Sequence, residues 1–125
     1  MKRNMKLYLQ DIGESILAIE EYAQNLSEDE FYSNHLVQDA IVRRLEIIGE
    51  AAKNIDDNFR DKYPQVPWKK IAGMRDIIAH EYFGVRLDRV WDVVRKDMPD
   101  LKGAERIFQL LLFCGISVIF GVCCL

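Results

Sequence analysis

The sequence predicts an all-α fold, built as an antiparallel bundle of four or five helices. Apolar residues recur three or four positions apart in several long segments, which is typical of amphipathic helices. No segment alternates polar and apolar residues for long enough to predict a strand. The helical segments are joined by short connections, which favour antiparallel neighbours. A chain of 125 residues, half of them hydrophobic, is large enough for one domain with its own core.

Two long helices are expected in the first half of the chain. The first covers residues 5 to 25, and the second covers residues 34 to 54. Between them, Ser27 and Glu30 have the spacing of a capping box, which predicts a new turn or helix at this point. Each long helix carries one apolar stripe, made of Leu9, Ile12, Ile16, Ile19 and Ala23 in the first and of Val37, Ile41, Leu45, Ile48, Ala52 and Ile55 in the second.

A third helix is expected after a polar connection. Residues 56 to 63 predict one short helical turn, which Pro64 stops. The third helix then begins at Pro67, since proline is tolerated in the first helical turn, and continues to about Tyr82. Gly84 is the expected C-terminal cap. The buried side of this helix carries Ile71, Met74, Ile77 and Ile78.

A fourth helix is expected over residues 87 to 97, and it should end before Pro99. Its buried side chains are expected to be Leu87, Val90, Trp91 and Val94. We therefore assign residues 1 to 102 to the helical bundle and residues 103 to 125 to an apolar C-terminal tail.

The tail has a different composition from the bundle. Between Ile107 and Leu125, only Gln109 and Ser117 are clearly polar. A terminal helix buried in the core or at an oligomer interface is the favoured interpretation. A membrane anchor is a second interpretation, because the length approaches that of a bilayer span. In a third, this segment is not the natural end of the domain.

The segment from Arg75 to Tyr82 carries the candidate chemistry. It contains an arginine, one of the two histidines of the chain and a tyrosine within eight residues. Arginine suits phosphate recognition, and histidine transfers protons near neutral pH. The combination indicates work on a phosphodiester, although a solvated arginine, a structural histidine and a half-buried tyrosine are also compatible with this spacing.

Helical geometry constrains how these side chains can cooperate. Arg75 and His80 project about 140° apart on a regular helix, whereas Asp76 and His80 face the same way. A joint site therefore requires a distorted helix or two copies of the segment that meet across a two-fold axis, and we favour the homodimer. In such a cleft His80 would act as general acid or base, Arg75 would stabilise phosphoryl charge and Asp76 would orient His80. Tyr82 would contact phosphate or a base.

The motif also carries a family resemblance. The order Arg75-Asp-x-x-x-His80-x-Tyr82 resembles the motif of HEPN-domain ribonucleases, and its tyrosine is similar to that of HepT-type toxins. Residues 44 to 52 resemble the second long helix of the family, and residues 67 to 75 resemble the lead-in to its motif. Residues 90 to 94 and 97 to 101 resemble the part of the chain that follows the motif. The resemblance covers residues 5 to 102. It implies an all-α homodimer in which Arg75 and His80 of both subunits line an RNA-cleaving, metal-independent site.

The same resemblance implies a toxin–antitoxin pair. The partner would be a nucleotidyltransferase antitoxin of the MntA type, which transfers AMP from ATP onto the motif tyrosine, here Tyr82. AMP would add bulk and negative charge where the substrate phosphate binds. Family members usually finish with a polar amphipathic helix, and the apolar segment after residue 106 departs from that pattern.

The charge balance limits how RNA could be bound. A net charge of −3 provides no global positive field, so RNA phosphates must meet a local basic patch. The candidates for this patch are Lys69, Lys70, Arg75, Arg86, Arg89 and Arg95, of which Lys69, Lys70 and Arg86 are the expected RNA contacts. A solvated face is an equally good interpretation. A helical protein that binds RNA or the antitoxin without cleavage is therefore the alternative function.

No cofactor or metal is expected. The two histidines are far apart and the three cysteines cluster in the tail, so metal-ligand spacing is absent, as is a glycine-rich phosphate loop. Glu46 and Glu50 lie one turn apart and could contact a metal, but ordinary surface ion pairs with Arg43, Arg44 and Lys53 are the favoured interpretation. The cysteine pattern and the absence of a secretory signal predict a cytoplasmic protein, for which a membrane is not the expected partner.

Overall fold

Helices are the only regular secondary structure in the described part of the protein, which confirms the predicted all-α class. The computed structural model describes residues 4–79 and 86–120, apart from the side chains of residues 77–79, 105 and 111–120. Its elements are α1 (Met5–Ala23), α2 (Glu28–Ser33), α3 (His35–Lys53), α4 (Asp57–Lys62), α5 (Trp68–Ala79), α6 (Leu87–Asp92), the π-helical turn η1 (Val93–Asp97) and α7 (Met98–Phe120).

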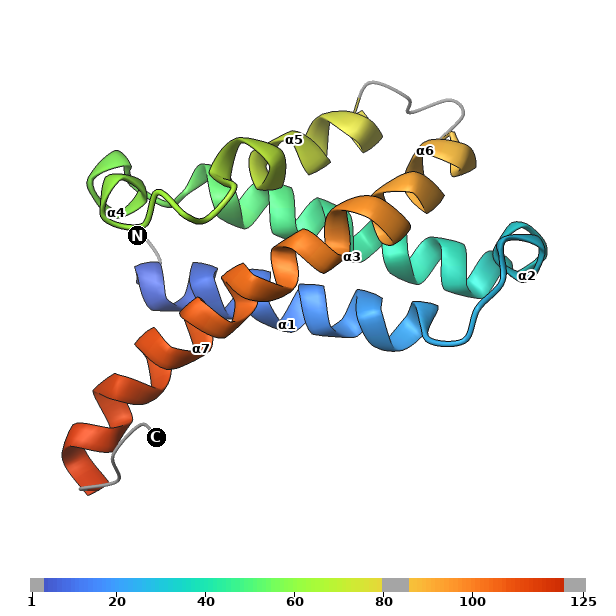
Figure 1. Ribbon diagram of the computed structural model, residues 1–125. Helices are drawn as coiled ribbons and strands as arrows, with labels where there is room; N and C mark the ends of the chain where they lie inside the picture. The colour runs from blue at the N-terminus through green and yellow to red at the C-terminus, as the bar shows by residue number, and fades with distance from the viewer. Residues whose placement is uncertain (1–3, 80–85, 121–125) are drawn as a thin grey trace.

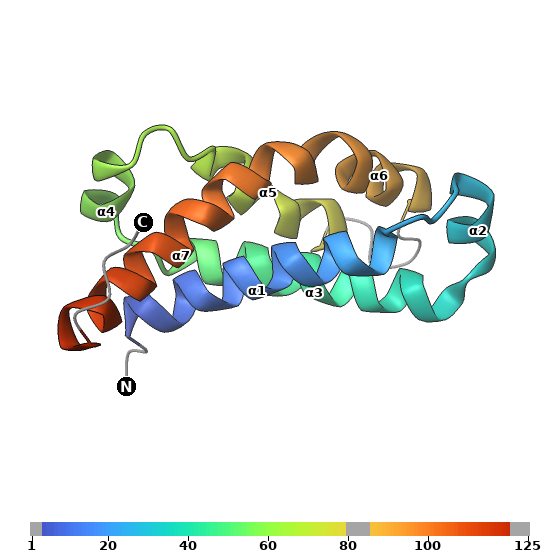
Figure 2. The same ribbon diagram turned by 60° about the horizontal axis from the view of Figure 1, so that its bottom comes forward.

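The long helices form an antiparallel bundle (Figure 1). Helix α3 returns beside α1, α5 lies along α3, and the rod formed by α6, η1 and α7 crosses α1. Figure 2 shows the same neighbours from a second direction, with α2 at one end of the bundle and α4 near the other. The chain therefore places α3 between α1 and α5.

Side-chain caps set the helix boundaries where the sequence predicted them. Ser27 Oγ accepts a hydrogen bond from the Glu30 amide at 3.1 Å, and the Glu30 carboxylate accepts one from the Ser27 amide at 3.3 Å. This reciprocal pair confirms the capping box. Asn34 caps α3 by accepting from the Val37 amide at 3.1 Å, and Asp56 caps α4 in the same way.

The expected end of the fourth helix before Pro99 is wrong. Helices α6 and α7 form one rod through η1, and Pro99 is the second residue of α7. A proline inside a regular α-helix clashes with the carbonyl of the fourth preceding residue. Here the Met98 amide donates to the Val93 carbonyl, five residues earlier, so the backbone is already widened where the proline ring must fit.

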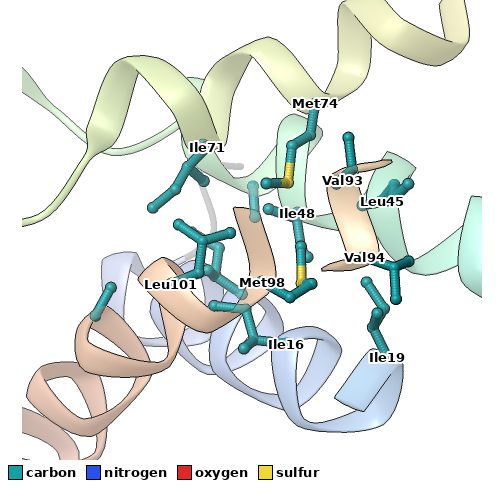
Figure 3. Packing of buried hydrophobic residues seen from close by; sticks show 14 of the residues in the cluster. Ile16, Ile19, Leu45, Ile48, Ile71, Met74, Val93, Val94, Met98 and Leu101 are labelled. Atoms are coloured by element: carbon teal, nitrogen blue, oxygen red, sulfur yellow. The ribbon is translucent and has the colours of Figure 1, made fainter. Parts of the chain in front are cut away.

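The apolar stripes meet in one core (Figure 3). Ile16 and Ile19 of α1, Leu45 and Ile48 of α3, and Met74 of α5 all contribute, together with Val93, Val94, Met98 and Leu101 from the long rod. Burial of each such side chain stabilises the fold by roughly 1.5–3 kcal/mol. Of the expected core residues, Ile77 and Ile78 have side chains outside the described part.

The core continues into the first half of α7. Ala104 and Phe108 are buried, and the Phe108 ring lies 5.6 Å from the ring of Trp68 on α5. Figures 1 and 2 show the later turns of α7 projecting past the first turn of α1. Within the described residues, no helix combines the length and apolarity that a membrane crossing demands.

Candidate active site

The backbone at Arg75 is packed directly against α3. Gly49 is buried in α3, and a Cβ atom built on it would lie 2.5 Å from the Cβ of Arg75. It would also lie 2.7 Å from the Arg75 amide nitrogen and 2.9 Å from its Cα. These distances leave no room for a side chain. Glycine at position 49 therefore permits the two helices to approach closely where the motif arginine begins.

The other end of the arginine side chain also contacts α3. Arg75 Nη1 lies 3.4 Å from a carboxylate oxygen of Glu50, and the two side chains are 40% and 63% exposed. A guanidinium has five N–H donors, of which one carboxylate can use at most two. Arg75 is therefore held against α3 and still offers donors to a phosphate from the solvent side.

Asp76 is exposed beside Arg75 on α5. A Cβ built on Gly73, one turn earlier, would meet no atom of the described residues within 4 Å, so none of these residues packs on α5 at that position. His80, Tyr82 and the expected cap Gly84 lie outside the described residues. The pairing of Asp76 with His80, and the angle between Arg75 and His80, thus stay predictions.

The structure does not gather the three proposed RNA-binding cations into one patch. Lys69 and Lys70 lie in the first turn of α5, whereas Arg86 precedes α6 near the opposite end of α5 (Figure 1). Lys69 is exposed. Lys70 lies 3.4 Å from both Asp97 and Asp100, and its hydrogen bond to Asp100 and the charge of Asp97 raise its pKa. The ion pairs of Lys70 therefore connect α5 to the long rod.

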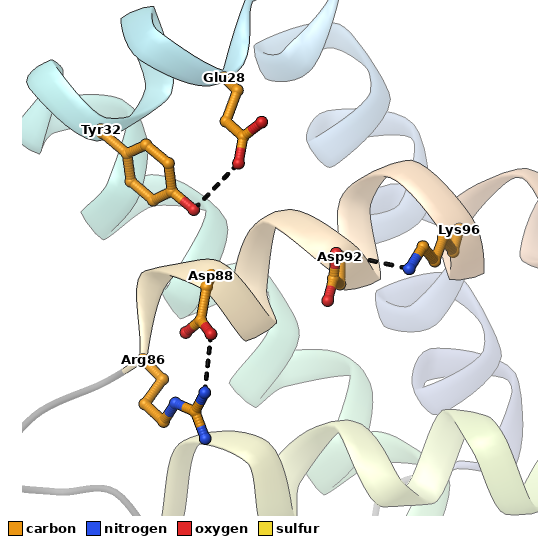
Figure 4. Close-up of polar contacts among 6 residues, drawn as sticks. All are labelled: Glu28, Tyr32, Arg86, Asp88, Asp92 and Lys96. Atoms are coloured by element: carbon orange, nitrogen blue, oxygen red, sulfur yellow. Dashed lines mark hydrogen bonds and ion pairs between the residues drawn. The ribbon is translucent and has the colours of Figure 1, made fainter.

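Arg86 also pairs with a carboxylate, but with a local one, two residues away at the start of α6 (Figure 4). Its guanidinium lies 2.8 Å from Asp88, and this hydrogen bond lowers the pKa of the Asp88 carboxyl. Nearby, the Tyr32 hydroxyl donates to Glu28 at 3.2 Å. Partial burial, followed by that hydrogen bond, raises the pKa of Tyr32. The corner between α2 and α6 is therefore rich in carboxylates, a feature that the sequence did not reveal.

A groove of about 710 Å³ lies elsewhere, between α1 and the start of α7. Glu20 and Lys102 pair across it at 2.7 Å, and Arg95 lies 4.4 Å from the ring centre of Trp91. None of the predicted site residues lines this groove, whose walls come from the second half of α1, the turn that follows it and the part of the rod between Val94 and Lys102. Within the described residues, no three potential metal ligands lie together.

The all-α bundle, with a partly exposed Arg75 on α5, agrees with the HEPN-like fold that the sequence predicts. More particularly, the chain belongs to the ribonuclease HepT-like family, whose model matches residues 12–105. This match confirms the family that the motif suggested. No solved structure matches the chain.

The relatives fall into two kinds. A protein of Methanocaldococcus jannaschii named "Gamma-glutamylcyclotransferase and putative RNase" is 50% identical over 111 residues, which are 89% of this chain and 49% of the relative. The chain thus spans about half the length of that relative. The "Probable ribonuclease HepT" of Thermococcus cleftensis is 46% identical over 103 residues, which are 82% of this chain and 94% of the relative. A "Putative RNase" of Caldanaerobacter subterraneus is 43% identical over 103 residues, 82% and 92% of the two chains.

Proposed function

We propose that the protein is a metal-independent endoribonuclease that serves as the toxin of a toxin–antitoxin pair. The observation that carries the proposal is the partly exposed Arg75 guanidinium, the arginine of the predicted motif, which still has donors for a phosphate. Relatives named as ribonucleases, with 43% and 46% identity and nearly full-length coverage, support the same activity. Two subunits related by a two-fold axis would bring Arg75 and His80 of both chains to one cleft.

The proposed reaction uses the ribose itself as the nucleophile. His80 removes the proton of the 2′-hydroxyl, whose oxygen attacks the adjacent phosphorus. The bond from phosphorus to the 5′-oxygen breaks, and the protonated His80 imidazole of the second subunit gives a proton to the leaving oxygen. The products are a 2′,3′-cyclic phosphate and a 5′-hydroxyl. Arg75 stabilises the charge that develops on the phosphoryl oxygens, and Asp76 orients His80.

Cleavage of RNA in the presence of EDTA tests this proposal. We expect the wild type to cut single-stranded RNA, and we expect Arg75→Ala and His80→Ala to lose activity by at least about 100-fold. DNA of the same sequence should stay intact because it lacks the 2′-hydroxyl. Glu46→Ala is a matched surface control, since Glu46 pairs with Arg43 at 3.2 Å on its own helix. Equal cleavage by wild type and both motif variants would reject the nuclease.

Binding without cleavage is the competing function. The net charge of −3, together with the carboxylate partners of Lys70, Arg86 and Arg75, is compatible with a protein that mainly contacts an antitoxin. Intact RNA that nevertheless shifts in mobility with the wild type would favour this function. We assign Lys69 the larger share of contacts to the RNA backbone, because Lys70 must first leave its two carboxylate partners.

We further propose that a nucleotidyltransferase antitoxin of the MntA type silences the toxin by modifying Tyr82. The tyrosine oxygen would attack the α-phosphate of ATP, and pyrophosphate would leave. The attached AMP would occupy the phosphate site beside Arg75 and repel RNA. Co-expression with such an enzyme should add the mass of one AMP unit to the wild type and to Tyr32→Phe, but not to Tyr82→Phe. Modification that persists in Tyr82→Phe would refute this assignment.

A further inference from the structure

We infer that Glu50 is a positioning residue for Arg75, and that Gly49 and Glu50 together form a two-point seat for the motif arginine. This inference rests on the proposed ribonuclease activity. The two residues are adjacent in α3, and each contacts a different end of the arginine. We call Gly49 and Glu50 the Arg75 seat.

Gly49 fixes where the side chain of Arg75 begins. The site of its absent Cβ lies within 3 Å of the amide nitrogen, Cα and Cβ of Arg75. The contact involves backbone atoms, which cannot move away by a change of rotamer. The direction of the Arg75 Cα–Cβ bond is therefore set by the packing of α5 on α3, and this packing is rigid on both sides of the crossing because Ile48 and Met74 are buried in the core.

Glu50 fixes where the side chain ends. Arginine has four rotatable side-chain bonds, so the guanidinium can still occupy many positions in the solvent when only the Cβ is fixed. The Glu50 carboxylate, 3.4 Å from Nη1, selects the conformers that lie along α3. Glu46, one turn earlier, pairs instead with Arg43 of the same helix. The carboxylate at position 50 is thus distinct from an ordinary i,i+3 surface pair.

The exposure of the pair indicates a geometric role. Ion pairs with this degree of exposure contribute little to the stability of a fold. Orientation of a group that must meet a phosphate can have a much larger effect, because a displacement of about 1 Å at a reacting centre can lower a rate by roughly 100-fold. Glu50 also places a negative charge next to the phosphate site, which opposes RNA binding. Loss of the carboxylate should therefore lower kcat while KM stays equal or falls.

Steady-state kinetics of Glu50→Ala, Glu50→Gln and the control Glu46→Ala test the inference. We expect kcat of Glu50→Ala to fall by roughly 10- to 100-fold without a rise in KM. Glu50→Gln should lie between Glu50→Ala and the wild type, because its amide oxygen can still accept from the guanidinium. Glu46→Ala should match the wild type. A kcat of Glu50→Ala equal to that of Glu46→Ala would overturn the inference, and so would loss of the acidic limb of the pH–rate profile, which would make Glu50 a proton-transfer group.

A measurement that does not need activity separates the inference from the proposed function. The Nε–Hε signal of Arg75 in nitrogen-edited NMR can be assigned from its absence in Arg75→Lys. We expect a resolved signal in the wild type and in Glu46→Ala, and a shifted, motionally averaged signal in Glu50→Ala. If RNA stays intact with every variant but this signal depends on Glu50, the ribonuclease proposal fails and the seat stands. If Arg75→Ala abolishes cleavage and Glu50→Ala alters neither signal nor rate, only the seat fails.

Discussion

Alanine at position 49 tests the helix crossing that positions Arg75. In an open helical position, Gly→Ala should stabilise a protein by about 1 kcal/mol, because glycine loses more backbone entropy on folding. Gly103 in α7 provides that reference, since a Cβ there would meet no described atom within 4 Å. Gly49→Ala gains the same helix propensity, but its new methyl group collides with α5 at Arg75.

The cost at Gly49 can be worked from the distances. An ordinary carbon–carbon contact is about 3.5 Å, and the new Cβ would lie 2.5 Å from the Cβ of Arg75, so the shortfall is about 1 Å. Separation of α3 and α5 by that amount weakens the contacts of the core between them, and overpacking of this kind costs about 2 kcal/mol. Gly49→Ala should therefore lower the free energy of unfolding by about 1 kcal/mol relative to the wild type. Its free energy of unfolding should lie about 2 kcal/mol below that of Gly103→Ala.

Urea denaturation followed by far-ultraviolet circular dichroism measures this difference. The comparison should be made at matched protein concentration, because an oligomer unfolds at a midpoint that depends on concentration. Equal slopes for the two variants would show that only stability has changed. If Gly49→Ala is as stable as Gly103→Ala, α3 and α5 do not cross as closely as the structure indicates, and the Arg75 seat loses its fixed end.

Two further substitutions test the interior and the charged surface. Ser15 is fully buried in α1, and its hydroxyl has no hydrogen-bond partner among the described residues. Ser15→Ala should therefore raise the free energy of unfolding by about 1 kcal/mol. The control Ser33→Ala, which loses an exposed hydrogen bond, should not raise it. The pKa of Asp88 is lowered from its ordinary value of 3.8 by Arg86, so its contribution to stability is present above that value and is lost as the pH falls through the lowered pKa. Asp88→Asn should therefore show a smaller loss of stability in acid than the wild type, and identical acid titrations of the two proteins would contradict the pairing.

The helices were predictable because their signals are local. Apolar spacing in α1 and α3 marks one face of each helix, and burial then follows from the need to cover that face. The caps at Ser27 and Asn34 depend on residues no more than three positions away. Pro99 misled the prediction for the same reason. The rule that proline stops a helix considers one regular helix, and the π-helical turn before Pro99 removes the conflict.

The candidate site was predictable only in part. The motif identified Arg75 without any structure, but its surroundings arise from a contact between α3 and α5. Spacing along α3 predicted that Glu46 and Glu50 would pair with cations on the same helix. This is confirmed for Glu46, which pairs with Arg43, and it is wrong for Glu50, whose partner is Arg75. Two glutamates one turn apart look alike in the sequence, and only the packing of α5 distinguishes them.

The pairing of surface cations leads to a final prediction about RNA binding. Binding of single-stranded RNA weakens with salt by a slope of about −0.7 on logarithmic axes for each phosphate that is neutralised. If Lys70 stays with Asp97 and Asp100 and Arg86 stays with Asp88, a dimer offers Arg75 and Lys69 from each subunit, which are four cations. Four contacts give a slope of about −3, whereas the participation of all eight cations would give about −6.

Affinity measured for the inactive His80→Ala variant over a range of salt concentrations distinguishes the two cases. A slope near −3 that becomes shallower in Lys69→Gln, but not in Lys70→Gln, would agree with the charges as they are paired in the structure. A slope near −6 would mean that RNA displaces the carboxylates from Lys70 and Arg86. In that case the ion pairs of Lys70 with Asp97 and Asp100, which join α5 to the long rod, would break on binding.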